Sequence, residues 1–173
     1  MTLHDATLSP TPDGAEPDPM AGGATVGDLR HLNATRALVV MILRDWFDGR
    51  DGPDRVAILL SRTLGASQAS EALTAWDDLA SRLSTQARRP ILRHGASCTC
   101  VGADEAVVSL ALDLAAQGAS EDAMMMLALL IPGDRVLGAH DAARRSGLFL
   151  RRAALRLADL ARRPVGPTGA RLH

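Results

Sequence analysis

The sequence contains no lysine and no tyrosine, and it has few aromatic residues of any kind. All 19 cationic side chains among its 173 residues are arginines. Chemistry that needs a lysine amine, such as Schiff-base catalysis or phosphate binding by a P-loop lysine, is therefore excluded. The aromatic residues are Trp46, Phe47, Trp76 and Phe149. They are too few for the stacking platforms of single-stranded nucleic-acid binders or for aromatic cages.

Long hydrophobic runs are also absent. The longest uninterrupted run, residues 123–132, is about half as long as a membrane-spanning helix requires. Residues 1–5 lack the basic and apolar regions that begin a signal peptide. The formal net charge is −1, so no general attraction to nucleic acid or to a membrane surface is expected. We expect a soluble, cytoplasmic protein.

The composition is that of a globular domain, with 47% hydrophobic and 23% charged residues. Residues 1–25 are rich in proline and glycine and are acidic, which predicts a disordered tail because such a segment buries too little apolar surface to offset its ordering entropy. Residues 26–163 are expected to form one helical domain. Residues 164–173 are expected to form a flexible C-terminal tail.

Apolar residues recur at steps of three and four throughout the domain, and no segment shows the alternation of a β-strand. This pattern predicts an all-α, single-domain bundle of six or seven helices joined by short Gly/Ser turns. Asp28, Ser67 and Ser120 are the expected N-caps of three helices. The expected helices cover 28–48, 51–64, 67–87, 103–117, 120–131, 132–146 and 148–163, with a break or kink at Ser146-Gly147 and with the fourth and fifth helices central.

The connector between residues 88 and 102 holds both cysteines of the chain, Cys98 and Cys100, close to His94. One imidazole and two thiolates form a soft ligand set that suits zinc. A fourth ligand would come from Asp104, Glu105 or the more distant His140. The Cys-x-Cys spacing is shorter than that of a zinc finger, so zinc is a possible cofactor rather than one required by a motif.

Other interpretations of this connector remain open. Cys100 precedes an expected helix N-terminus, which favours a thiolate and would suit a redox sensor, although Asp104 and Glu105 at the same helix end oppose it. A catalytic cysteine with a histidine base is a further alternative. Both cysteines could also be small apolar fillers of an ordered loop. A pair so close in sequence closes almost no loop, so a secreted disulfide scaffold is not expected.

Charge is distributed unevenly between the two ends of the chain. Residues 1–29 contain acidic residues and no arginine, whereas the last 30 residues are strongly basic. A basic amphipathic helix can bind an anionic membrane, a nucleic-acid backbone or an acidic partner, and it could pair with the acidic N-terminal tail of its own chain. A solvated helix face is the alternative. The arginines of this predicted partner surface are Arg144, Arg145, Arg151, Arg152, Arg156, Arg162 and Arg163.

Residues 60–70, Leu-Ser-Arg-Thr-Leu-Gly-Ala-Ser-Gln-Ala-Ser, resemble the turn of a bacterial helix-turn-helix unit. The resemblance implies a DNA-binding regulator. The helix that would read the DNA carries Asp77 and Asp78, however, and acidic side chains repel phosphates. We therefore expect a small non-catalytic regulatory or adaptor protein that binds a metal ion or senses redox state through the His94/Cys98/Cys100 loop. An enzyme or thiol-redox protein using a loop thiolate, and a DNA-binding regulator, are the alternatives.

Overall fold

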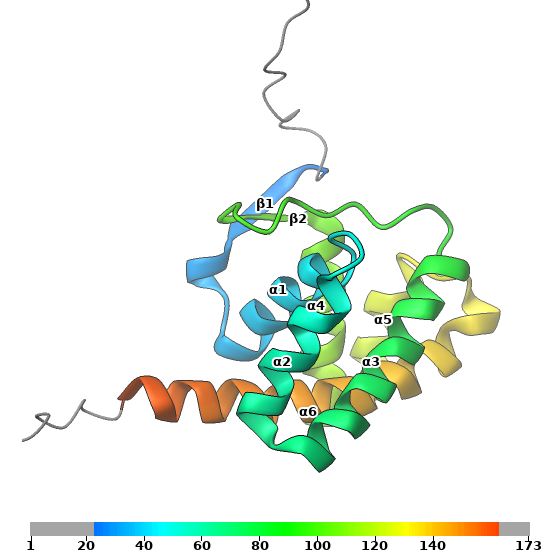
Figure 1. Ribbon diagram of the computed structural model, residues 1–173. Helices are drawn as coiled ribbons and strands as arrows, with labels where there is room; N and C mark the ends of the chain where they lie inside the picture. Colours follow the sequence, from blue (N-terminus) through cyan, green and yellow to red (C-terminus); the bar gives the residue numbers. More distant parts are fainter. Residues whose placement is uncertain (1–22, 163–173) are drawn as a thin grey trace, which may run out of the picture.

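The computed structural model describes residues 23–162 as a bundle of α-helices with a small two-stranded sheet at one end (Figure 1). The predicted all-α bundle is confirmed. Residues 1–22 and 163–173 lie outside the described part. Arg163 and most of the predicted N-terminal tail therefore lie outside it, and so does the predicted pairing of this tail with the C-terminal helix. The helices are α1 (Ala34–Trp46), α2 (Gly52–Leu64), α3 (Ala66–Thr85), α4 (Ala103–Gln117), α5 (Ser120–Ala128) and α6 (Val136–Arg162).

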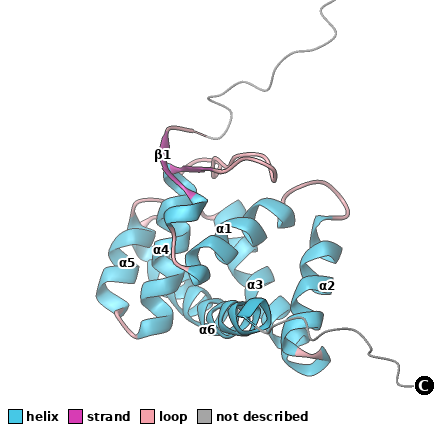
Figure 2. Ribbon diagram, turned by 90° about the vertical axis from the view of Figure 1, so that its left-hand side faces the viewer, coloured by secondary structure: helices cyan, strands magenta, loops and turns pink. Residues whose placement is uncertain are grey.

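Helix α6 organises the bundle, because it contacts each of the other five described helices. Figure 2 shows it end-on beneath them. The predicted break at Ser146-Gly147 was wrong, since α6 continues through both residues. A Cβ atom on Gly147 would lie 2.5 Å from the carbonyl oxygen of Leu112 in α4, and the Ser146 hydroxyl donates to the carbonyl of Ala75 in α3 at 2.8 Å. The two residues therefore allow close helix packing rather than a bend.

Helix α5 is not the buried centre that its continuous apolar sequence predicted. It ends at Ala128, and Met125 and Leu129 are 65% and 60% exposed. Only one side of the segment, which includes Ala123 and Leu127, enters the core. The prediction failed because an apolar sequence with no polar face does not show which side will be buried.

The sheet was not predicted, because its strands are too short to show an alternating pattern. Strand β1 (Thr25–Asp28) pairs antiparallel with β2 (Cys100–Gly102), and Asp28 lies opposite Cys100. Asp28 caps a single 3-10 turn rather than the long helix expected. Asn33 is the N-cap of α1, since its side chain accepts a hydrogen bond from the Arg36 N–H at 2.9 Å.

The predicted bounds of α4 and the predicted last residue of α2 agree with the structure, whereas the predicted N-caps of α3 and α5 do not. Helix α4 has the predicted bounds, and it ends at Gly118 with a positive φ of 85°. Helices α3 and α5 begin after Gly65 and Ala119, so Ser67 and Ser120 lie inside their first turns. No helix within residues 23–162 has the length and apolar character needed to cross a membrane.

The long connection between α3 and β2 crosses the end of the bundle opposite α6, as both views show (Figures 1 and 2). It passes over the C-terminal end of α1 and brings both cysteines to the start of α4.

Candidate functional site

A buried ion pair lies beneath the connection between α3 and β2. Arg44, in the last turn of α1, and Glu105, in the first turn of α4, have side chains that are 1% and 0% exposed. The guanidinium donates through Nε to Oε1 at 2.7 Å and through Nη2 to Oε2 at 2.8 Å. This is the two-point geometry that makes Arg–carboxylate pairs strong and directional.

The carboxylate of Glu105 is also bound by the backbone. The N–H groups of Gly102 and His94 donate to it at 2.8 and 2.9 Å, and the contact with Gly102 satisfies one of the free donors at the start of α4. Burial raises the pKa of Glu105, but the hydrogen bonds from Arg44, Gly102 and His94 outweigh it, so the pKa lies below its ordinary value. The group is therefore a stable anion.

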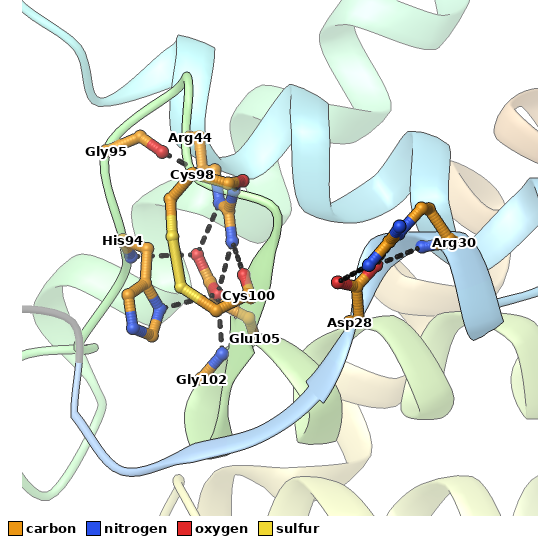
Figure 3. Close-up of a disulfide and its surroundings, with 9 residues drawn as sticks. All are labelled: Asp28, Arg30, Arg44, His94, Gly95, Cys98, Cys100, Gly102 and Glu105. Carbon is orange, nitrogen blue, oxygen red and sulfur yellow. Dashed lines mark hydrogen bonds and ion pairs between the residues drawn. A yellow bond between two sulfur atoms is a disulfide. The ribbon is translucent and has the colours of Figure 1, made fainter.

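The remaining donors of Arg44 hold the loop that carries the cysteines. Nη1 donates to the carbonyl of Cys98 at 2.5 Å and, at the longer distance of 3.4 Å, to that of Gly95. Nη2 donates to the carbonyl of Cys100 at 2.6 Å. Because the guanidinium is anchored by Glu105, these contacts fix the loop backbone to the helical core (Figure 3).

The two cysteines are joined to each other by a disulfide (Figure 3). Their Cα atoms are 5.5 Å apart, and both residues are half-buried. Thr99, between them, is exposed, and its carbonyl accepts a hydrogen bond from the Leu29 N–H at 2.8 Å. The backbone that follows β1 is thus hydrogen-bonded to the residue inside the disulfide ring. In this state neither sulfur is a thiolate, so zinc binding or nucleophilic attack would require reduction first.

His94 lies against the Arg44–Glu105 ion pair. Its side chain is 8% exposed, and its Nδ1 is 3.2 Å from Oε2 of Glu105. Its Nε2 is buried and has no hydrogen-bond partner among the described residues.

The other two predicted ligands, Asp104 and His140, make no hydrogen bond or ion pair with His94, Cys98 or Cys100 among the described residues. Asp104 accepts two hydrogen bonds from Arg89, at 2.6 and 2.8 Å, and one from the Leu92 N–H at 2.8 Å. His140 is buried in α6. Within the described part of the chain, no three His, Cys, Asp or Glu residues are grouped so that they could hold a metal ion.

Most arginines of the predicted partner surface already have partners within the bundle. Arg145 pairs with Asp78 and Asp141, and its pKa is raised mainly by the hydrogen bond to Asp78. Arg156 donates to the last carbonyls of α2 at 3.1 Å. Arg144, Arg152 and Arg162 contact Asp141, Gln68 and Asp159 respectively. Among the described residues of this set, only the exposed Arg151 makes no such contact.

The segment that resembles a helix-turn-helix unit forms the tight corner between α2 and α3, with Gly65 as the only residue between the two helices. On α3, Glu71 and Asp77 are exposed, and Asp78 pairs with Arg82 and Arg145. The exposed face of α3 is therefore acidic at these positions.

Arg44, whose side chain holds the loop, was not among the residues predicted from the sequence. A signal was available, because residues 38–43 are apolar on every side of α1 and Arg44 follows Val40 by one helical turn. Arg44 lies on the same side of α1 as the buried Val40, and a buried arginine requires an anion. The sequence did not show which carboxylate would meet it, since Glu105 lies 61 positions away.

Comparison with known proteins adds no family. No family model, no curated protein and no solved structure matches the chain significantly.

Proposed function

We propose that the protein is a small redox-responsive regulator in which Cys98 and Cys100 form a reversible disulfide switch. The observation that carries this proposal is the disulfide itself, formed across one intervening residue between two half-buried cysteines of an otherwise exposed loop. A disulfide that closes so short a loop restricts the unfolded chain little. The loss of loop entropy stabilises the fold by only ~1.5 kcal/mol, whereas a disulfide that closes a 15-residue loop contributes about 3 kcal/mol. A role in stability alone therefore explains it poorly.

The switch reaction is an ordinary thiol–disulfide exchange. The thiolate of a small thiol such as glutathione attacks one sulfur, which breaks the Cys98–Cys100 bond and releases the other sulfur, and this sulfur takes up a proton. A second glutathione thiolate then attacks the mixed disulfide, so that glutathione disulfide leaves and the second protein thiol forms. Two electrons and two protons enter the protein, and glutathione disulfide drives the reverse reaction.

The contacts of the disulfide ring indicate which part of the structure a change of redox state would affect. Strand β1 pairs with β2 at Cys100, and Leu29 is hydrogen-bonded to Thr99 within the ring. Arg44 and Glu105 hold the loop from below and do not depend on the sulfur oxidation state. Because Arg44 keeps its hold on the carbonyls of Cys98 and Cys100, reduction would free only the Thr99 peptide between them and β1, while the helical core stays folded. Such a local change suits regulation of a partner.

The test is to equilibrate the full chain with glutathione buffers of graded redox state, trap free thiols by alkylation, and digest each sample briefly with trypsin. We expect both cysteines to titrate together and reversibly. We also expect cleavage after Arg30 and Arg93 to be faster in the reduced protein, while cleavage after Arg62 in α2 is unchanged. The Cys98→Ser/Cys100→Ser variant should follow the reduced protein. Equal cleavage in both states, or a disulfide that never re-forms, would contradict the switch.

Zinc added to the reduced chain separates the metal interpretation from this one. Zinc that protects both thiols from alkylation would assign the loop to metal binding instead. Thiols that stay reactive in zinc support the redox role.

A further inference from the structure

A cavity of about 500 Å³ lies at the start of the connection between α3 and β2, and the disulfide switch does not involve it. Its walls are the last turns of α3, the Arg88–Arg93 segment that follows, and Phe47 at the end of α1. The volume is within the range of about 300–1,000 Å³ that is typical of small-molecule sites.

The inner wall of this cavity is apolar. Phe47, Leu83, Ala87 and Ile91 line it, and all four are buried or half-buried. No carboxylate is among the lining residues. A ligand that fills the space would therefore gain mainly by covering hydrocarbon.

The rim of the cavity is cationic, and its three arginines are not equivalent. Arg89 is neutralised by its two hydrogen bonds to Asp104. The Arg93 guanidinium lies over the Phe47 ring, 5.5 Å from its centroid, and donates to the Phe47 carbonyl, so it is held in place without a counterion. The exposed Arg88 side chain makes no hydrogen bond or ion pair within residues 23–162, although its N–H is anchored to the Leu130 carbonyl at 2.8 Å.

The charge at this site is therefore positive. Two guanidinium groups lack a counterion among the described residues, whereas the carboxyl end of α3 contributes only about half a negative charge. A guanidinium binds a carboxylate through two parallel hydrogen bonds. An apolar wall combined with unpaired guanidinium groups is complementary to a small molecule that has an apolar body and one anionic head.

From this complementarity we infer that the cavity is a binding site for an amphipathic carboxylate, with Arg88 and Arg93 holding the head group and the Phe47–Leu83–Ile91 wall covering the hydrocarbon. The inference is independent of the redox switch, since it requires no change at Cys98 or Cys100. The site would give the protein a second input, from a metabolite of fatty or aryl carboxylic acid type.

The experiment is a calorimetric titration of the oxidised full chain with decanoate, with decanol as the uncharged probe and acetate as the head group alone. We expect saturable binding of about one decanoate per chain at submillimolar concentration and at least tenfold weaker binding of the other two probes. Decanol binding as tightly as decanoate would remove the role of the arginines. Acetate binding as tightly would remove the role of the apolar wall.

Variants locate the site. Arg88→Met/Arg93→Met should weaken decanoate binding by about tenfold or more, as expected for lost charge-assisted hydrogen bonds. Arg151→Met, which removes an exposed and unpaired charge from α6, should leave it unchanged. Ser84→Phe, at an exposed position on the cavity wall, should block the space and abolish binding while circular dichroism shows an intact fold. Unchanged affinity in either cavity variant would overturn the assignment.

Discussion

The ion pair between Arg44 and Glu105 gives the sharpest prediction about stability. Both side chains are essentially inaccessible to solvent, so neutralising one partner leaves the other as an uncompensated buried charge. Such a loss typically costs about 3–5 kcal/mol. We expect Glu105→Gln to lower the free energy of unfolding by that amount, because the new amide would place donors against the donors of Arg44 and Gly102.

A double-mutant cycle separates the pair from its surroundings. Arg44→Met should cost about as much as Glu105→Gln, since it removes the counterion and the donors of three loop carbonyls. The two changes together should cost much less than their sum, with a coupling of at least about 2 kcal/mol. Full recovery is not expected, because the loop carbonyls stay unpaired at about 1 kcal/mol or more each.

The assay is urea unfolding at neutral pH, followed by circular dichroism, with the disulfide intact. Arg55→Met is the matched control, because Arg55 pairs with Asp48 on the surface at 43% and 63% exposure and should contribute less than about 1 kcal/mol. Single variants of Arg44 and Glu105 that cost no more than this control, or effects that simply add, would refute the reasoning.

Three further predictions follow from the same contacts. Lowering the pH should destabilise the wild type more than Glu105→Gln, and urea midpoints at graded pH will show this. The folded-state pKa of Glu105 lies below its ordinary value of 4.5. The contribution of its charge to the free energy of unfolding is therefore complete above pH 4.5 and is lost as the pH falls toward the folded-state pKa. Gly147→Ala should lower the thermal midpoint, because the new Cβ would meet the Leu112 carbonyl, although alanine favours a helix by about 1 kcal/mol. Gly133→Ala, where space is open, is its control, and a stabilised Gly147→Ala would contradict the packing. Cys98→Ser/Cys100→Ser should lower the free energy of unfolding by no more than ~1.5 kcal/mol, and a larger loss in urea would make the disulfide a structural element.

Helical periodicity was sufficient to predict the fold class, and for α4 it predicted the bounds, because its glycine stop follows an uninterrupted apolar pattern. It failed where tertiary contacts override local signals. The local sequence Ser146-Gly147 is typical of a helix break. In the bundle, however, these two residues lie where α6 packs closely against α4 and α3. The strands β1 and β2 are too short to have a period, and their pairing joins residues far apart in the chain.

The candidate site was predicted in part. The sequence indicated the segment that carries the disulfide, because both cysteines of the chain lie in this connector beside His94. The sequence could not show that the two sulfur atoms bond to each other, or that Asp104 binds Arg89 instead of a metal. Both outcomes depend on how the connector lies across the bundle, which Arg44 and Glu105 determine from distant positions.

Amide hydrogen exchange at Leu29 tests the central claim most directly, since its N–H is bonded to the carbonyl of Thr99 between the two cysteines. The switch predicts that reduction of the full chain accelerates exchange at Leu29 by at least about tenfold, while Ala111 in the core of α4 stays protected. Tenfold is the factor expected when a hydrogen bond worth roughly 1.4 kcal/mol is lost. Equal protection of Leu29 in the oxidised and reduced proteins would contradict it.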